Sequence, residues 1–392
     1  MNHPVIVDAI RSPMARARAD GALAQVHPVD LLSQVLAQLV ARNKLDPALV
    51  DDVICGCVSQ AGEQAGTPGR LAWLAAGLPK HVPSTTIDRK CGSSQQAVHF
   101  AAQAIMAGVQ DIVIACGVES MSRVPMGSSR MGKNTTGAAF DERYAPGLVG
   151  QGVSSDLIAA KWGLGREQLD RYAARSHQRA HEAQSAGCFQ REIVGIDTPT
   201  GRVTQDETIR AGTTVEKLAT LKPAFENDDL SERFPQIGWH TTAGNASQMT
   251  DGASAMLIMS EQKARELGLA PRARFVAFDV VGDDPLLMLT APIPATQRVL
   301  AKAKMKLSDI QHYEINEAFA TVPLAWQKEL GADDARLNPR GGAIALGHPL
   351  GASGIRLMTT MLHAMEDSGQ RYGLQSMCEA GGMANATIIE RL

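Results

Sequence analysis

The sequence contains no run of about 18 apolar residues, the length that a membrane-spanning helix needs. It has few aromatic side chains, 4% of the chain, and no block of lysines and arginines. Its 38 basic side chains are balanced by 41 acidic ones. These absences argue against nucleic acid or an anionic membrane as the main partner, so a small molecule is the expected one.

The N-terminal segment lacks the long apolar stretch of a signal peptide, because its short apolar run contains Asp8 and is followed by scattered arginines. The six cysteines lie in apolar or glycine-rich stretches without secretory features. We therefore expect reduced thiols in a cytoplasmic protein. We predict no metal site, because Cys55-x-Cys57 has no second pair of ligands.

Strand-like and helix-like apolar runs alternate along the 392 residues, a pattern typical of an α/β sheet covered by helices. The same order recurs in the C-terminal third, offset by roughly 260 residues. Residues 274–278 correspond to the first strand, and residues 372–378 correspond to 111–116. Two related halves are therefore predicted. The segment from about Ser120 to Gly244 matches neither half, and its length and helical stretches favour a lid or binding domain.

Cys91 lies just before a predicted helix, whose apolar positions follow helical spacing at Val98, Ala101, Ala102 and Ile105. Free N–H groups at a helix N-terminus stabilise a thiolate, so a lowered pKa and a nucleophilic role are one interpretation. The other is a buried, inert cysteine, which is the commoner situation.

Three further polar residues stand in loops. His348 precedes a proline among the five glycines of residues 341–354; no Gly-Lys-Ser/Thr follows, so a phosphate loop is disfavoured, while a turn histidine bonded to its neighbours stays open. Asn316 follows a strand-like stretch, where helix capping alone would explain it. Cys378 ends a strand before a glycine-containing turn, and a core cysteine is its alternative.

Together these stretches resemble the thiolase family, which shows a Cys-Gly-Ser motif, Asn-Glu-Ala-Phe, Gly-His-Pro and a late Cys-x-Gly-Gly-Gly-like loop in this order. Residues 221–225 and 242–247 extend the resemblance over essentially the whole chain. It implies a thiolase-like α/β fold of two βαβαβαββ halves, in a five-layered α-β-α-β-α core with an inserted loop domain. The expected boundaries are 1–120 and 249–270 for the N-terminal half, 121–248 for the CoA-binding loop domain, and 271–392 for the C-terminal half.

The resemblance also implies roles for individual residues. Cys91 takes the acyl group, His348 activates it and binds an oxyanion together with water held by Asn316, and Cys378 handles the second proton. The backbone N–H groups of Cys91 and Ala380 would form a second oxyanion site. Coenzyme A is the implied co-substrate, with no tightly bound cofactor, and its expected contacts are Arg210, Phe225, Ser247, Ala318 and Phe319.

Two departures affect the expected geometry: the family usually has Asn where this chain has Asp88, and Gly where it has Ala380. Alanine still supplies an N–H group provided that its φ need not be positive. Residues 151–156 also differ from the His-Met-Gly-containing run of short-chain acetoacetyl-CoA thiolases, which indicates a different acyl pocket.

We therefore expect a degradative 3-ketoacyl-CoA thiolase of fatty-acid or related β-oxidation, accepting longer or bulkier chains such as a steroid side chain. The alternatives are an acetyl-CoA C-acetyltransferase making acetoacetyl-CoA and a non-catalytic CoA- or lipid-binding protein. The resemblance implies a homodimer or homotetramer, in which the strand at 111–116 would join a shared sheet, and it leaves room for a β-oxidation partner subunit.

Overall fold

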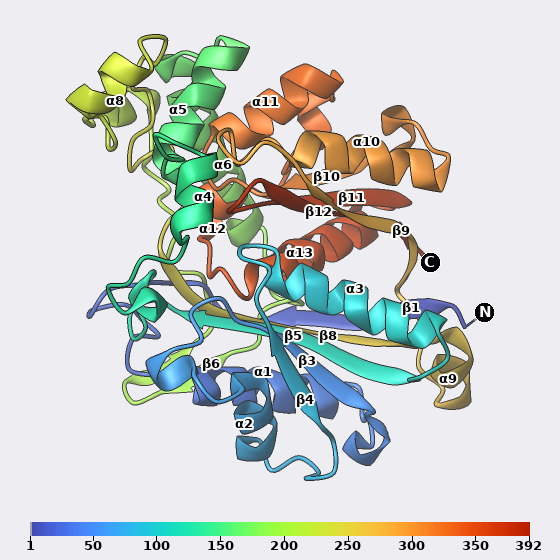
Figure 1. Ribbon diagram of the computed structural model, residues 1–392. Helices are drawn as coiled ribbons and strands as arrows, with labels where there is room; N and C mark the ends of the chain where they lie inside the picture. Colours follow the sequence, from blue (N-terminus) through green and yellow to red (C-terminus); the bar gives the residue numbers. More distant parts are fainter. Residues whose placement is uncertain (1) are drawn as a thin grey trace.

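The computed structural model describes residues 2–392, in which the ten core strands form two sheet layers joined by one short pairing and stacked alternately with three layers of helices (Figure 1). One sheet belongs to each half of the chain. Helices α3 and α13 lie between the sheets, while α1 and α2 cover one outer face and α10 and α11 cover the other. The predicted five-layered α-β-α-β-α architecture is confirmed.

The first sheet places its strands in the order β1 (Pro4–Arg11), β8 (Thr250–Ser260), β5 (Ile112–Ser120), β3 (Asp52–Gly56) and β4 (Ser84–Ile87), with the short β2 (Ala15–Arg16) beside β8. Its helices are α1 (Pro28–Arg42), α2 (Pro68–Ala75) and α3 (Ser93–Met106). The chain order is therefore βαβαβαββ, as expected. Strand β5 pairs with both β8 and β3, so residues 111–116 offer no free edge to a second subunit, and their place in a shared sheet stays a prediction. The free edge of this sheet is β4.

The second sheet has the order β9 (Ala273–Gly282), β12 (Met383–Arg391), β11 (Tyr372–Glu379) and β10 (His312–Ile315). Its helices are α10 (Pro292–Ala303), α11 (Thr321–Leu330) and α13 (Ser353–Ser368). The third strand of the repeat is reduced here to one bridge between Tyr313 and Leu337. A short pairing of β1 with β9, at Val5 and Ile6, joins the two sheets.

The middle layer forms because α3 and α13 bury residues on more than one face and pack against each other as well as on the sheets. Their closest approach is at Gly354, where an added Cβ would lie 2.3 Å from the backbone nitrogen of Gln95. Since this space is filled, a larger residue would push the two helices apart. Both helices begin at the same end of the molecule, so their N-termini bring Cys91 and His348 toward each other.

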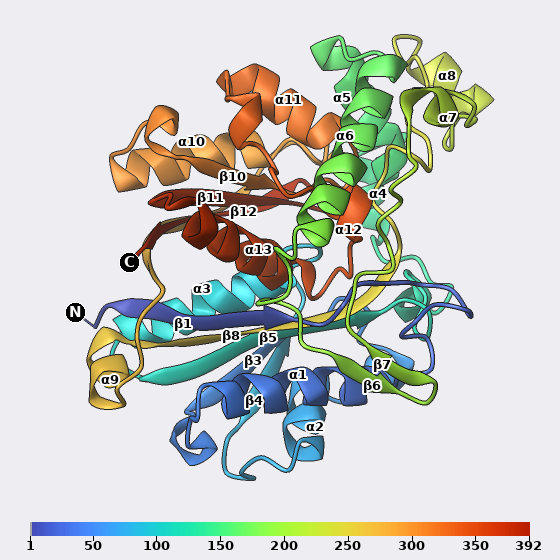
Figure 2. The same cartoon turned by 180° about the vertical axis from the view of Figure 1, so that it is seen from behind.

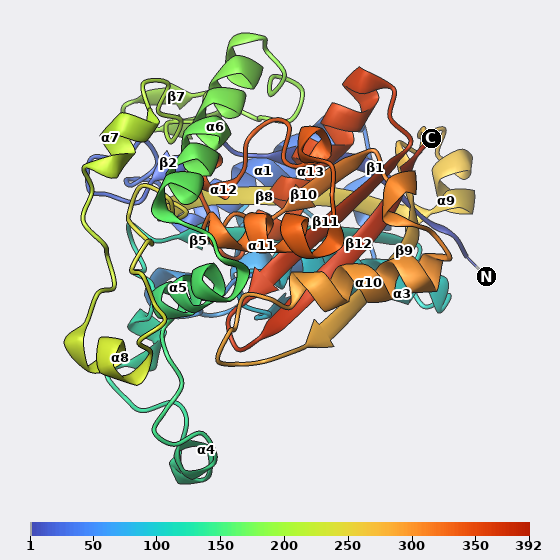
Figure 3. The same cartoon turned by 90° about the horizontal axis from the view of Figure 1, so that it is seen from above.

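Between β5 and β8 the chain forms α4 (Ala138–Arg143), α5 (Gln151–Trp162), α6 (Arg166–Ser185), the hairpin β6 (Ile196–Thr198) and β7 (Gly201–Val203), α7 (Val215–Ala219) and α8 (Asp228–Arg233). Figure 3 shows these elements along one side of the layered core, with α4 extending furthest from it. The apolar side chains of α5 and α6, such as Ile158 and Tyr172, share a core with the second half. The segment is therefore anchored to the body and borders the site. Helix α9 (Glu261–Glu266) then leads to β9, at the edge where both chain termini lie (Figure 2).

Candidate active site

Cys91 occupies a tight turn between β4 and α3 and is only 4% exposed. Asp88 Oδ1 accepts a hydrogen bond of 2.7 Å from the N–H of Lys90, and its other oxygen lies 2.6 Å from the Lys90 ammonium. Lys90 has a φ of 49°, a left-handed conformation that costs free energy for a non-glycine residue. Asp88, which stands where the family usually has asparagine, therefore stabilises the strained turn that places Cys91 at the N-terminus of α3.

His348 lies in the loop between α12 (Ala343–Leu346) and α13, and is buried. Its backbone N–H donates to Thr250 Oγ1 at 3.0 Å, and its Nδ1 lies 2.6 Å from Ser353 Oγ. The Ser353 hydroxyl donates its only hydrogen to the carbonyl of Pro349, at 2.8 Å, so it accepts from His348 Nδ1–H. His348 Nε2 is then unprotonated and able to accept a proton.

Asn316 and Cys378 come from adjacent strands of the second sheet. Asn316 Nδ2 lies 3.5 Å from His348 Nε2 and 3.8 Å from Cys378 Sγ. Asn316 does not cap a helix, because α11 begins only at Thr321; the capping interpretation is wrong. Its side-chain amide instead connects the imidazole with the second thiol.

The four predicted residues therefore meet in one buried place between the halves. Cys91, Leu350 and Met377 belong to one small apolar cluster, which brings the nucleophile turn next to the His348 loop and the end of β11. Burial raises the pKa of Cys91 well above its ordinary value, and negative charge on Cys378 or Glu379 would raise it further. The N–H groups of Cys91 and Ala380 act in the opposite direction.

The expectation of a lowered Cys91 pKa is thus wrong, because the removal of the sulfur from water outweighs the N-terminal N–H groups. Burial also raises the pKa of Cys378 to about 12, although the Asn316 amide lowers it. Burial, and to a lesser extent the charge of Arg356, lowers the pKa of His348 to about 3. Both thiols and the imidazole are therefore uncharged at neutral pH.

Ala380 tolerates the loss of the family glycine. It is not among the non-glycine residues with positive φ, whereas Gly381 and Gly382 after it have φ values of 93° and 76°. The left-handed part of this turn therefore begins one residue later, where glycine is retained.

The five predicted CoA contacts also lie close together. The Ser247 N–H donates to the Ala318 carbonyl at 2.9 Å, and the rings of Phe225 and Phe319 meet edge to face with centroids 6.1 Å apart. Arg210 donates to Gln248 Oε1 at 3.1 Å, and the Gln248 carbonyl accepts from the His348 N–H, also at 3.1 Å. Of the five, Arg210 lines a cavity of about 140 Å³ together with Leu218, Ala246 and Gln248, and Gln248 connects this cavity with His348.

Two buried carboxyl groups that hold the site together were not predicted. Glu119 accepts from the N–H groups of Val58, Ser59 and Gly351, and thereby fixes the loop after His348 to the first half. Glu317 accepts from Tyr172, Ser176, Asn338 and the Ile344 N–H. Its place beside Asn316 in the Asn-Glu-Ala-Phe run was the available signal, but the partners are distant in sequence.

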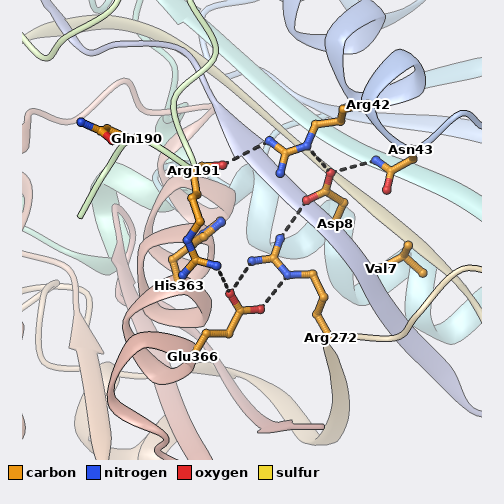
Figure 4. A pocket seen from close by; sticks show the side chains of 9 residues that line it. All are labelled: Val7, Asp8, Arg42, Asn43, Gln190, Arg191, Arg272, His363 and Glu366. Atoms are coloured by element: carbon orange, nitrogen blue, oxygen red, sulfur yellow. Dashed lines mark hydrogen bonds and ion pairs between the residues drawn. The ribbon is translucent and has the colours of Figure 1, made fainter. Parts of the chain in front are cut away.

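A further hollow lies elsewhere and contains none of the predicted site residues. Its volume is about 620 Å³, and ion-paired side chains of β1, α1 and α13 line it (Figure 4). Within residues 2–392 we find neither a cluster of side chains suited to a metal ion nor a helix with the length and apolar character to cross a membrane.

A buried thiol in a strained turn, close to a second thiol, a neutral imidazole and an amide, defines an α/β enzyme equipped for covalent acyl transfer. The family model for the thiolase N-terminal domain matches residues 4–262, and that for the thiolase C-terminal domain matches residues 269–391. The chain belongs to the thiolase family, whose members are acyltransferases.

Three comparisons indicate its place in the family. It is 48% identical to "Steroid 3-ketoacyl-CoA thiolase FadA6" of Mycobacterium tuberculosis, over 100% of this chain and 95% of the relative. It is 44% identical to a "3-ketoacyl-CoA thiolase" of Pseudoalteromonas translucida, over the full length of both. The crystal structure of the Bacillus anthracis acetyl-CoA acetyltransferase superposes with a TM-score of 0.89 at 38% identity, covering 100% of this chain and 99% of that one.

Proposed function

We propose that the chain is a 3-ketoacyl-CoA thiolase, which cleaves a 3-oxoacyl-CoA with coenzyme A into acetyl-CoA and a shortened acyl-CoA. The observation that carries this proposal is the meeting of Cys91, Cys378, His348 and Asn316 in one buried place, contributed by both halves. A non-catalytic CoA- or lipid-binding protein would not need two thiols and an oriented imidazole together.

In the first step, the Cys91 thiol gives its proton to His348 Nε2 while its sulfur attacks the 3-keto carbon. The oxyanion formed there accepts hydrogen bonds from the N–H groups of Cys91 and Ala380. Collapse of this intermediate breaks the carbon–carbon bond, leaves the acyl group on Cys91 and expels the enolate of acetyl-CoA. Protonated His348 and water held by Asn316 stabilise the enolate oxygen, and the Cys378 thiol protonates the enolate carbon.

In the second step, incoming coenzyme A gives its thiol proton to the Cys378 thiolate and attacks the acyl group. Cys91 leaves as a thiolate and recovers its proton from His348. Cys91, His348 and Cys378 are uncharged in the resting enzyme, which suits this order of steps. Each proton then moves only when the substrate accepts or supplies the compensating charge.

We also propose that residues 121–248 form the loop domain that binds coenzyme A, between a first half of residues 1–120 and 249–270 and a second half of residues 271–392. The guanidinium of Arg210 suits the nucleotide phosphates. The backbones around Ser247 and Ala318 and the ring of Phe319 would hold the pantetheine arm where the cavity approaches His348.

The favoured substrate has a long or bulky acyl chain, in keeping with the steroid thiolase relative and with residues 151–156 in α5. The alternative is an acetyl-CoA C-acetyltransferase, which the fold of the Bacillus anthracis enzyme favours. The kcat/KM values for acetoacetyl-CoA and for a ring-bearing 3-oxoacyl-CoA separate the two. A higher value for the ring-bearing substrate supports our proposal, and a clear preference for acetoacetyl-CoA supports the alternative.

For the assembly, we propose a cytoplasmic homodimer or homotetramer that pairs through the free edge at β4, with a β-oxidation partner subunit as a further component. Strand β4 has hydrogen-bonding groups on one side that no other described strand uses. Light scattering of the purified protein tests the oligomer: a monomeric mass at micromolar concentration would contradict it.

A further inference from the structure

Glu379 is a buried carboxyl group next to the second thiol in sequence. It ends β11 directly after Cys378, so the two side chains leave opposite faces of the strand. Glu379 has 0% exposure, and neither of its carboxyl oxygens has a hydrogen-bond partner within residues 2–392. Burying such a group without a partner is costly, so its place calls for a functional explanation.

The carboxyl group lies against the nucleophile turn. A Cβ atom added to Gly92 would come within 1.9 Å of Glu379 Oε1 and 2.7 Å of its Cδ. Only a glycine after Cys91 therefore leaves room for this side chain. Glu379 thus extends from the strand that carries one thiol to the turn that carries the other.

The charge of Glu379 acts on both sulfur atoms: its ionised form raises the pKa of Cys91 and of Cys378. Burial raises the pKa of Glu379 itself to about 8. Three groups around Glu379 change this pKa further. The charge of Arg89 and the Asn385 N–H of β12 lower the pKa of Glu379, and the charge of Asp88 raises it. Arg89 makes no hydrogen bond to Glu379, and its Nη1 instead lies 3.9 Å from Met383 Sδ.

We propose that Glu379 is a positioning residue for the two thiols: its neutral form lets them reach the thiolate state, and its ionised form suppresses them at alkaline pH. The inference rests on the proposed roles of Cys91 and Cys378, and the family motif assigns no role to this position. Glu379 contacts neither leaving group nor nucleophilic atom in the steps above, and it acts only through the charge that the sulfurs experience.

The test is Glu379→Gln, which keeps the shape of the side chain and removes its charge. Iodoacetamide labelling of Cys91 is followed by peptide mass spectrometry between about pH 6 and about pH 10. Below the pKa of Glu379 the variant and the wild type should react equally. Above it, the variant should react about tenfold faster, because one nearby charge shifts a thiol pKa by about one unit.

Glu390→Gln is the matched control, since it neutralises another buried glutamate, on β12, which pairs with the exposed Arg274 and Arg371. It should reproduce the wild-type profile. The alkaline decrease of kcat/KM for thiolysis should shift to higher pH in Glu379→Gln, and in neither the wild type nor Glu390→Gln.

Identical labelling profiles for Glu379→Gln and the wild type would overturn the inference. Labelling that avoids Cys91 in every protein would instead contradict the proposed function. If Glu379→Gln does not fold, the labelling profile of the wild type still tests the inference. Its labelling rate should rise by less than about tenfold per pH unit near the pKa of Glu379. A full tenfold rise per pH unit throughout would contradict the inference.

Discussion

At the scale of single residues, the orientation of His348 depends on one hydroxyl group. Ser353 accepts from His348 Nδ1 at 2.6 Å and donates to the Pro349 carbonyl at 2.8 Å. This pair of bonds selects the tautomer in which Nε2 is the base, and it holds the ring toward Asn316.

We predict that Ser353→Ala lowers kcat by about tenfold or more, since a lost hydrogen bond of about 1–2 kcal/mol frees the ring to rotate and change tautomer. KM should change little, because Ser353 lies outside the CoA cavity. Steady-state thiolysis of acetoacetyl-CoA measures both. Ser368→Ala is the control, since that hydroxyl bonds only to the Ala364 carbonyl at the far end of α13. Equal kcat values for the two variants would refute the role of Ser353.

The sequence could predict Cys91, His348, Asn316 and Cys378 because each stands in a short motif whose order is informative. It could not predict Ser353 as the partner of His348, because the conformation of the loop between them decides which side chain meets Nδ1. Nor could it predict Glu379, whose contact with Gly92 exists only once β11 has packed against the nucleophile turn. The prediction of a lowered Cys91 pKa was also wrong because of tertiary packing. The sequence shows that Cys91 precedes a helix, but it does not show that the thiol is buried beside a carboxyl group.

At the scale of elements, a buried polar network fixes α3, and hence the Cys91 turn, to the second sheet. Gln95 Nε2 and His99 Nε2 each lie 2.7 Å from Thr387 Oγ1 on β12. The Asn385 amide contacts His99 Nδ1 at 3.2 Å. Helix periodicity predicted α3, but it gave no indication that one face of the helix is polar and buried.

We predict that Thr387→Val lowers the free energy of unfolding by about 1–3 kcal/mol, since it leaves two buried polar side chains without their shared partner. Thr387→Ser keeps the hydroxyl group and should lose less, mainly the methyl contact. Urea unfolding followed by circular dichroism compares the two. Equal losses would show that packing of the methyl group, and not the hydroxyl network, holds α3 in place.

The predicted βαβαβαββ repeat of the two halves is only partly present. The first half has the complete βαβαβαββ order, whereas the second half keeps a single bridge at Leu337 in place of its third strand. The segment around Leu337 and Asn338 instead binds Tyr172 and Glu317 through the Asn338 amide. Contacts with the inserted segment thus replace strand pairing that periodicity alone would favour.

At the scale of the whole molecule, ion pairs near the C-terminal end of α13 connect the two halves (Figure 4). Arg272, in the connection between the halves, contacts Asp8 of β1 at 2.8 Å and Glu366 of α13 at 2.7 Å. Arg191 of the inserted segment also reaches Glu366, at 3.1 Å. All three parts of the chain therefore meet in one network.

We predict that this network makes stability depend on acid pH. Burial raises the pKa of Glu366, but the hydrogen bonds and charge of Arg272 outweigh it and lower the pKa below the ordinary value. A lowered carboxyl pKa stabilises the fold above the unfolded-state pKa of about 4.3, and the gain is lost as pH falls through the folded-state pKa.

Arg272→Met should accordingly be less stable than the wild type at neutral pH, and the difference should shrink as the solution is acidified into that range. Arg202→Met, which removes an exposed pair with Asp197, should change stability by less than about 1 kcal/mol at any pH. Urea denaturation at a series of pH values provides the comparison. A constant deficit for Arg272→Met at every pH would mean that packing, not charge, explains its effect.

The central claim is that Cys91 carries the acyl group during turnover. The direct measurement is rapid acid quenching of the enzyme with acetoacetyl-CoA, followed by peptide mass spectrometry, without added coenzyme A so that the second step cannot proceed. We predict an acetyl group on Cys91 alone, removed again on addition of coenzyme A. Thiolysis that proceeds with an unmodified Cys91, or with the acetyl group on another residue, would contradict the account.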